Sequence, residues 1–337
     1  MAGIASEYVS ALAPALPSAL VSEGALARLQ EAAAALSFVA EGGFECRLGP
    51  DQKVIDFQVC LSARQAALGV LSDSPAGQRA RDLPAWAPIL RWMQAWASST
   101  FSSEVACVWL EFDLHAPPPE APGVFFFSPT QGASLQGLLA SLEQLTGAPL
   151  PASQVAAALR CQRALRGRDV ASLGLTLGRA EQALALTLPG LSVEQASELL
   201  LEIEWPGDHA HAIAVARRFA PFADRLCLML PIGTDLWPRV GIELYLDKNP
   251  AEGWPRLLGE LVQEGLCAAD KGAGMLAWPG SSSPLPESGL ARLAALIGAP
   301  NPRPIERRIN HVKLTCSPGQ STEAKGYLAF RHGGGMI

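Results

Sequence analysis

The sequence predicts an α+β fold in which ten antiparallel strands close into a barrel with helices on the outside. Five pairs of short β-rich runs, each joined by a turn, recur along the 337 residues, and helical stretches separate them. Each run alternates large aliphatic residues with polar or small ones, so every strand has one apolar and one polar face. Closing such a sheet removes its edges, lets the helices cover the apolar face and makes the polar face an internal lumen.

The composition excludes several classes of protein. Hydrophobic residues make up 49% and charged residues 17% of the chain, which suffices for a large core. A net charge of −6 does not favour a nucleic-acid surface, and charges, prolines or glycines interrupt every apolar run before it could span a membrane. The seven cysteines show no C-x-x-C spacing, so we expect them to be buried and free. With no signal-peptide pattern at the N-terminus, we expect a cytoplasmic protein that binds neither nucleic acid nor membrane.

The expected domain organisation is an N-terminal extension over residues 1–23 and a single barrel domain over residues 24–337. Residues 24–40 combine strong helix formers with apolar residues at helical spacing, and the pair Gly42-Gly43 is expected to end this helix.

The remaining elements follow the same two patterns. Hairpins are expected at residues 44–48 with 53–62, 105–114 with 123–128, 171–179 with 182–190, 225–233 with 239–247, and 308–316 with 323–330. Helices are expected at residues 63–99, 134–145, 153–165, 192–201, 208–219, 250–265 and 288–297. Ser192 and Gln195 have the spacing of a capping box, and Asn249 precedes a proline at the first helical position.

The last hairpin carries the most informative polar face. Alternation places Ile309, His311, Lys313 and Thr315 on one side of its first strand, and Glu323, Lys325 and Tyr327 on one side of its second. If the sheet closes, these side chains lie in the lumen rather than in water.

The arrangement of five hairpins with intervening helices resembles that of the ABBA-type prenyltransferases, which include aromatic, indole and cyanobactin peptide prenyltransferases. The resemblance covers the chain from Gly24 to Phe330 and depends on topology and alternation rather than on a signature motif. It implies a transferase that ionises an allylic diphosphate, such as dimethylallyl or geranyl diphosphate, inside the barrel. The prenyl group then passes to a small aromatic or peptide side-chain acceptor, which would modify peptides or natural products.

The resemblance also implies roles for inward-facing residues. Cations and hydroxyl donors must hold the departing diphosphate, because negative charge grows on it in the transition state. Members of the family place lysine, arginine and tyrosine in this way, and the matching positions here are Arg47, Arg239, Tyr245, Lys313, Lys325 and Tyr327. An acid on an early strand would hold the acceptor, either Asp56 or Glu111. The prenyl and acceptor pocket would include Trp109, Met229, Glu243 and His311.

One departure from the family pattern keeps a second function open. The third hairpin offers only Ser172, Gly174, Thr176 and alanines to the lumen, with Arg179 at its end, and the inward acids at least match the inward bases. The alternative function is therefore a non-catalytic barrel that binds a peptide or a partner enzyme. The alternative fold is two separate α+β domains.

Other catalytic classes lack their motifs. The sequence contains no G-x-G-x-x-G after a strand, no P-loop, no G-x-S-x-G and no aspartate-rich run of the metal-dependent isoprenyl synthases. His209 and His211 lie two apart on a helix and point in different directions, so we read them as a solvated helix start. We expect no tightly bound cofactor and no metal site; Mg²⁺ could accompany a diphosphate, but the sequence does not indicate it.

Overall fold

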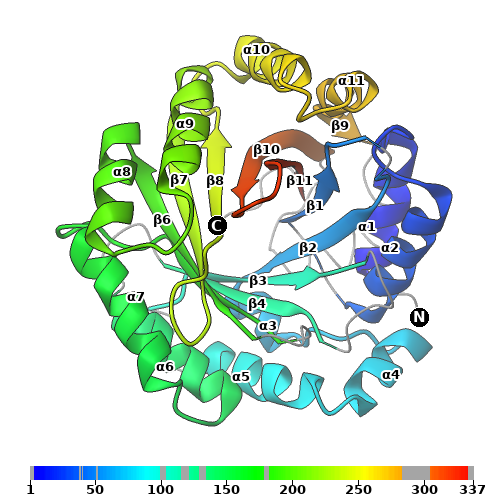
Figure 1. The fold of residues 1–337 in the computed structure, drawn as a ribbon. Coiled ribbons are helices and arrows are strands. Elements are labelled where there is room, and N and C mark those ends of the chain that lie inside the picture. The colour runs from blue at the N-terminus through cyan, green and yellow to red at the C-terminus, as the bar shows by residue number, and fades with distance from the viewer. Residues whose placement is uncertain are drawn as a thin grey trace.

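The strands of the protein form a closed barrel. The computed structural model describes residues 4–37, 39, 41–50, 52–98, 104–114, 121–128, 134–177, 182–282 and 304–332. In this part of the chain the strands are hydrogen-bonded in the order β11-β1-β2-β3-β4-β5-β6-β7-β8-β10, and β10 also pairs with β11, which completes the ring. The pairings are antiparallel, and the short β9 joins the start of β10. The predicted ten-stranded barrel is thereby confirmed, with helices forming a ring around it (Figure 1).

The five hairpins alternate with helices along the chain. The strands are β1 (Glu41–Arg47), β2 (Ile55–Leu61), β3 (Cys107–Phe112), β4 (Gly123–Phe127), β5 (Ser172–Thr176), β6 (Leu184–Leu191), β7 (Arg225–Ile232), β8 (Val240–Tyr245), β9 (Gly280–Ser282), β10 (Ile305–Cys316) and β11 (Glu323–His332). The helices are α1 (Ile4–Leu12), α2 (Glu23–Ala35), α3 (Ala63–Ala67), α4 (Pro75–Asp82), α5 (Trp86–Ser98), α6 (Leu135–Thr146), α7 (Ala152–Ala164), α8 (Val193–Glu202), α9 (His209–Phe219), α10 (Pro250–Gln263) and α11 (Ala269–Ala277). None of them is long and apolar enough to cross a membrane.

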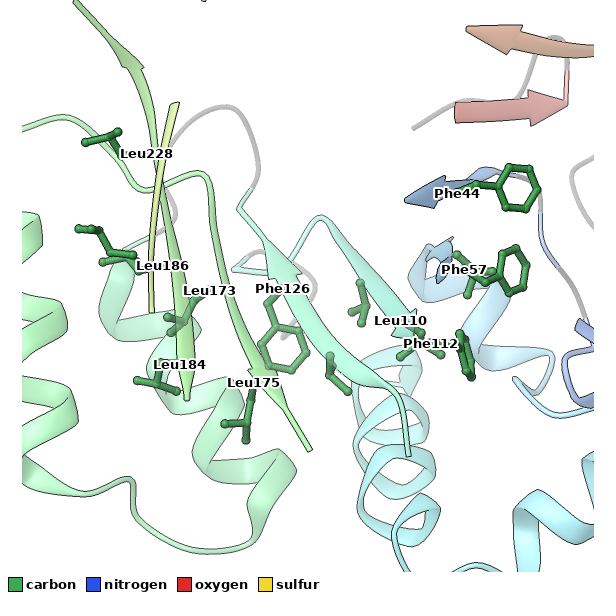
Figure 2. Close-up of a cluster of buried hydrophobic side chains, with 14 of the residues drawn as sticks. Phe44, Phe57, Leu110, Phe112, Phe126, Leu173, Leu175, Leu184, Leu186 and Leu228 are labelled. Atoms are coloured by element: carbon green, nitrogen blue, oxygen red, sulfur yellow. The ribbon is translucent and has the colours of Figure 1, made fainter. Parts of the chain in front are cut away.

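The hydrophobic core lies between the outer face of the barrel and the helices. Figure 2 shows part of it, from Phe44 on β1 to Leu228 on β7. Aromatic contacts link neighbouring strands to each other and to the helices: Phe44 stacks on Phe57 with ring centroids 5.9 Å apart, and Trp92 of α5 lies 4.4 Å from Phe126. The apolar faces therefore point outward, which leaves the polar faces for the lumen.

The first helix segment also packs on this core. Tyr8 of α1 is fully buried and stacks on Phe330 of β11, with ring centroids 5.9 Å apart. Helix α1, which falls in the predicted N-terminal extension, thus packs against the outer face of β11.

The prediction of a helix over residues 24–40 is wrong at its C-terminal end. Helix α2 stops at Ala35, because Leu36 adopts an extended conformation and bridges to Leu71. Gly42 and Gly43 do not end the helix but lie within β1. A Cβ on Gly42 would come within 2.6 Å of the Gln58 carbonyl oxygen, so neighbouring backbone approaches too closely there for a larger residue.

The prediction of one helix over residues 63–99 is also wrong, because three helices occupy it. Gly69 has a φ of +94°, a left-handed conformation that breaks the first helix, and Ser74 caps the next one. Leu83 is extended and ends α4 before α5 begins at Trp86. Helix α11 was not predicted, and the helix expected over residues 288–297 lies outside the described residues.

Several local predictions are confirmed. Ser192 and Gln195 form the capping box of α8. Asn249 precedes α10 as expected, although its side chain makes no capping hydrogen bond and instead donates to Glu252. All seven cysteines are free and buried.

Candidate functional site

The barrel encloses a cavity of about 740 Å³, a size typical of small-molecule sites. It runs along the barrel, since Arg225 at the start of β7 and Pro231 near its end both line it. The predicted site residues that line it are Trp109, Glu111, Met229, Arg239, Glu243, Tyr245, His311, Lys313, Lys325 and Tyr327. Arg47 and Asp56 are not among the lining residues, although Arg47 contacts Glu45 and Glu323, which are.

Strand register places three bases side by side. Lys313 on β10 lies opposite Lys325 on β11, and Lys325 lies opposite Arg47 on β1. We call Lys313, Lys325 and Arg47 the basic row. Like charges on directly opposite residues repel each other, so a sheet keeps such a row only where negative groups compensate it.

Carboxylates of the protein itself compensate each member of the basic row. Lys313 Nζ lies 3.5 Å from Glu243 Oε1, and Lys325 Nζ donates to Glu45 Oε1 at 2.9 Å. Arg47 contacts both Glu45 and Asp56, the latter at 2.9 Å.

Glu45 takes part in two of these ion pairs. Burial alone would raise the pKa of Glu45, but Lys325 and Arg47 outweigh burial and hold that pKa well below its usual range. Glu45 is therefore ionised near pH 7.

Four stacked side chains lie next to the basic row. Arg225 sits 3.9 Å from the centre of the Tyr245 ring, Tyr245 stacks on His311 at 4.7 Å, and His311 stacks on Tyr327 at 3.9 Å. We call Arg225, Tyr245, His311 and Tyr327 the stacked column. Burial lowers the pKa of His311 to about 4, so the imidazole is neutral near pH 7.

The tyrosines of the stacked column present their hydroxyl groups to acids. Tyr245 donates to Glu243 at 3.0 Å and Tyr327 donates to Glu45. Because Arg225 and His311 cover both faces of the Tyr245 ring, that ring has no face left for a ligand.

A β-bulge sets the position of His311. The register between β10 and β11 shifts between Ile309 and His311, so Asn310 and His311 both line the cavity. Ile309 is instead buried in the outer core. The prediction that Ile309 shares a face with His311 is therefore wrong.

The cavity wall opposite the basic row carries smaller and mostly uncharged side chains. Glu111 lines it and accepts a hydrogen bond from Gln58 at 3.2 Å. Asp56, the other candidate acid, is 1% exposed and accepts a hydrogen bond from the Leu114 backbone at 2.7 Å.

Beyond Glu111, small side chains and aromatic rings predominate in this wall. As expected for the third hairpin, Ser172, Thr176, Ala183, Ala185 and Thr187 line it. The ring of Phe125 lies over Gly174, where a Cβ would be 2.1 Å from the ring. Arg179, expected at the end of this hairpin, lies outside the described residues.

Sequence reasoning missed several lining residues. Arg225 lies four residues before Met229 on β7, so both side chains face the same side of the strand. Because the alternation already placed Met229 inward, it could also have identified Arg225. Phe125 and Phe127 sit in a run of three phenylalanines that has no polar phase. Trp237 lies in a hairpin loop, where no periodicity applies.

No protein-family model and no curated protein sequence matches the chain. The fold is similar to that of the prenyltransferase PriB in its apo form, with a TM-score of 0.54 and 14% identity over 96% of this chain and 94% of that chain. It is also similar to 5-dimethylallyltryptophan synthase from Streptomyces coelicolor, with a TM-score of 0.53 and 14% identity over 97% of each chain. The expected ABBA fold is therefore confirmed.

Proposed function

We propose that this protein transfers an allylic prenyl group from its diphosphate to an aromatic acceptor inside the barrel. The observation that carries the proposal is the basic row next to donor hydroxyls at a cavity of suitable size inside the barrel. The similar fold of PriB supports it, since one structure of that protein contains product diphosphate and another contains L-tryptophan with dimethylallyl thiolodiphosphate.

The donor would lie with its diphosphate toward Lys313 and Lys325. When the carbon–oxygen bond breaks, the electron pair stays on the diphosphate, and the lysine ammonium groups stabilise the growing negative charge. Arg225 at the start of β7 and Arg239, just before β8, line the same cavity and would add positive charge near the donor. Dimethylallyl or geranyl diphosphate is the proposed donor.

The allylic cation would then face the aromatic wall. Trp109, Phe125 and Phe127 line this part of the cavity, and the faces of aromatic rings stabilise cations. The acceptor ring supplies the electron pair for the new carbon–carbon bond and then passes its proton to the Glu111 carboxylate. We assign Glu111 to orient the acceptor, because Glu111 lines the cavity and Asp56 does not. Asp56 instead positions Arg47. A tryptophan-like ring, free or in a peptide, suits this wall.

A second candidate function has one observation in its favour. Among the described lining residues, five acids face four bases, and the members of the basic row already have carboxylate partners. Such a lumen could hold a peptide or another ligand without diphosphate, as a non-catalytic binding protein would.

Thermal unfolding in the presence of donors separates the two functions. A ligand at one hundred times its dissociation constant stabilises the folded state by about 2.7 kcal/mol. We expect dimethylallyl, geranyl or farnesyl diphosphate to raise the melting temperature of the wild type and of Lys248→Ala, whose lysine is exposed outside the barrel. Lys313→Ala and Lys325→Ala should fold but lose the shift. If no diphosphate shifts the wild type, the non-catalytic function replaces the transferase.

A further inference from the structure

We propose that Glu45 competes with the donor's diphosphate for Lys325 and Arg47, and that the diphosphate binds with uptake of one proton by Glu45. The inference rests on the proposed function in one respect, namely that the ligand is a diphosphate. It makes donor binding a reaction that consumes a proton.

The geometry places the Glu45 carboxylate where a phosphate oxygen would bind. Its Oε1 accepts from Lys325 at 2.9 Å and from Arg47, and its Oε2 accepts from the Tyr327 hydroxyl. Glu45 is 4% exposed and yet lines the cavity. Glu45 thus binds the two cations and the hydroxyl group that phosphate oxygens would otherwise contact.

Charged and titratable groups surround Glu45 on every side. Those that interact with it are Cys46 and Arg47 on β1, Asp56 on β2, His311 and Lys313 on β10, and Lys325 and Tyr327 on β11. Three further acids act on these neighbours: Glu111 on β3 and Glu243 on β8 on Tyr327, and Glu323 on β11 on Arg47. Of these, the three bases favour the charged carboxylate, while burial and the other acids favour the neutral carboxyl.

Diphosphate binding would reverse this balance. Once phosphate oxygens take the donors of Lys325 and Arg47, the carboxylate is left buried beside new negative charge. A buried carboxylate next to an anion takes up a proton, and the resulting O–H can then donate to a phosphate oxygen. Protonated Glu45 would then bind the diphosphate as a hydrogen-bond donor.

The other acids near the basic row are weaker candidates. Glu243 meets one base, Lys313, at 3.5 Å. The Glu323 side chain is 45% exposed, so solvent screens its contact with Arg47. Of the acids in the described part of the chain, Glu45 is the one that joins two members of the basic row at their junction.

Calorimetric titration with inorganic pyrophosphate tests the proposal. At about pH 8, Glu45→Gln should bind pyrophosphate at least about tenfold more tightly than the wild type, because glutamine carries no competing charge. The wild-type affinity, divided by that of the variant, should fall about tenfold for each pH unit between the pKa of Glu45 in the free protein and the higher pKa that it has in the complex, and should become constant above the latter. Because pyrophosphate ionises in the same way in both measurements, its own titration cancels from this ratio. Buffers of different ionisation enthalpy should show about one more proton taken up by the wild type.

Two further variants make the result specific. Glu202→Gln removes an exposed acid that pairs with Arg166 at 3.3 Å, and it should behave as the wild type. Tyr327→Phe keeps the Glu45 carboxyl but removes a hydrogen bond that favours its charged form, so the pH profile should move toward higher pH. The Tyr327→Phe profile decides the question if Glu45→Gln does not fold.

The outcomes separate the two levels of the argument. Equal affinities and equal proton uptake in the wild type and Glu45→Gln, or an unshifted Tyr327→Phe profile, would overturn the role of Glu45 and leave the transferase proposal standing. Absence of pyrophosphate binding in both proteins at every pH would overturn both.

Discussion

Replacing the buried Lys271 should destabilise the barrel. It should also loosen the backbone of Arg47, a member of the basic row, because Lys271 binds that backbone. Lys271 lies at the third position of α11 and is 2% exposed. Its ammonium donates to the backbone carbonyls of Arg47 at 2.9 Å, Gln52 at 2.6 Å and Gly49. One charged side chain thus closes the β1–β2 turn and holds the backbone of Arg47.

The magnitude follows from these three hydrogen bonds. A hydrogen bond to a charged group contributes about 1.5–3 kcal/mol, and three that share one ammonium do not add fully. We therefore expect Lys271→Met, which keeps the length of the side chain, to lower the free energy of unfolding by about 3–5 kcal/mol. The melting temperature should fall by about 4–7 °C.

Urea unfolding followed by tryptophan fluorescence and by circular dichroism measures this loss. Lys248→Met is the matched control, since Lys248 is exposed, and its unfolding free energy should stay within about 0.5 kcal/mol of the wild type. If Lys271→Met is as stable as this control, the three carbonyl contacts do not hold the turn and the reasoning is refuted.

Three further substitutions probe the cavity wall. In Gly241→Ala, the new methyl would lie 2.6 Å from Lys313 Cε and displace the end of this side chain, so calorimetry should show about tenfold weaker diphosphate binding; unchanged binding would contradict the position proposed for the Lys313 ammonium group. Gly174→Ala should push the Phe125 ring into the cavity and weaken geranyl more than dimethylallyl diphosphate, whereas equal losses would contradict that placement. Glu111→Gln should lower kcat by about 10²- to 10⁴-fold with donor affinity unchanged, and a loss of donor affinity would show that Glu111 acts at the donor instead.

Much of the fold was predictable because each strand carries its own evidence. Val240, Ile242 and Leu244 alternate with Gly241 and Glu243, and the structure turns the first set outward and the second inward. This period of two does not depend on distant parts of the chain. Closure followed from the need to bury five apolar faces under helices.

Positions that depend on tertiary contacts could not be predicted in this way. Helix α2 ends at Ala35 because Leu36 bridges to Leu71, a partner that local helix propensity does not see. A bulge shifts the phase of β10 by one residue, so Ile309 faces outward while His311 faces inward.

The candidate site was predicted as a set of residues but not as an arrangement. Alternation put Lys313 and Lys325 on inward faces, but only strand register shows them opposite each other and beside Arg47. The sequence already showed that inward acids and bases balance. Only the structure shows that Glu45 forms ion pairs with both Arg47 and Lys325.

A crystal structure with dimethylallyl thiolodiphosphate, an analogue that resists ionisation, tests the central claim most directly. We expect the diphosphate inside the barrel, with its oxygens on Lys313 and Lys325 and the prenyl chain toward Trp109. An analogue bound outside the lumen, or a lumen left empty at saturating concentration, would contradict the account.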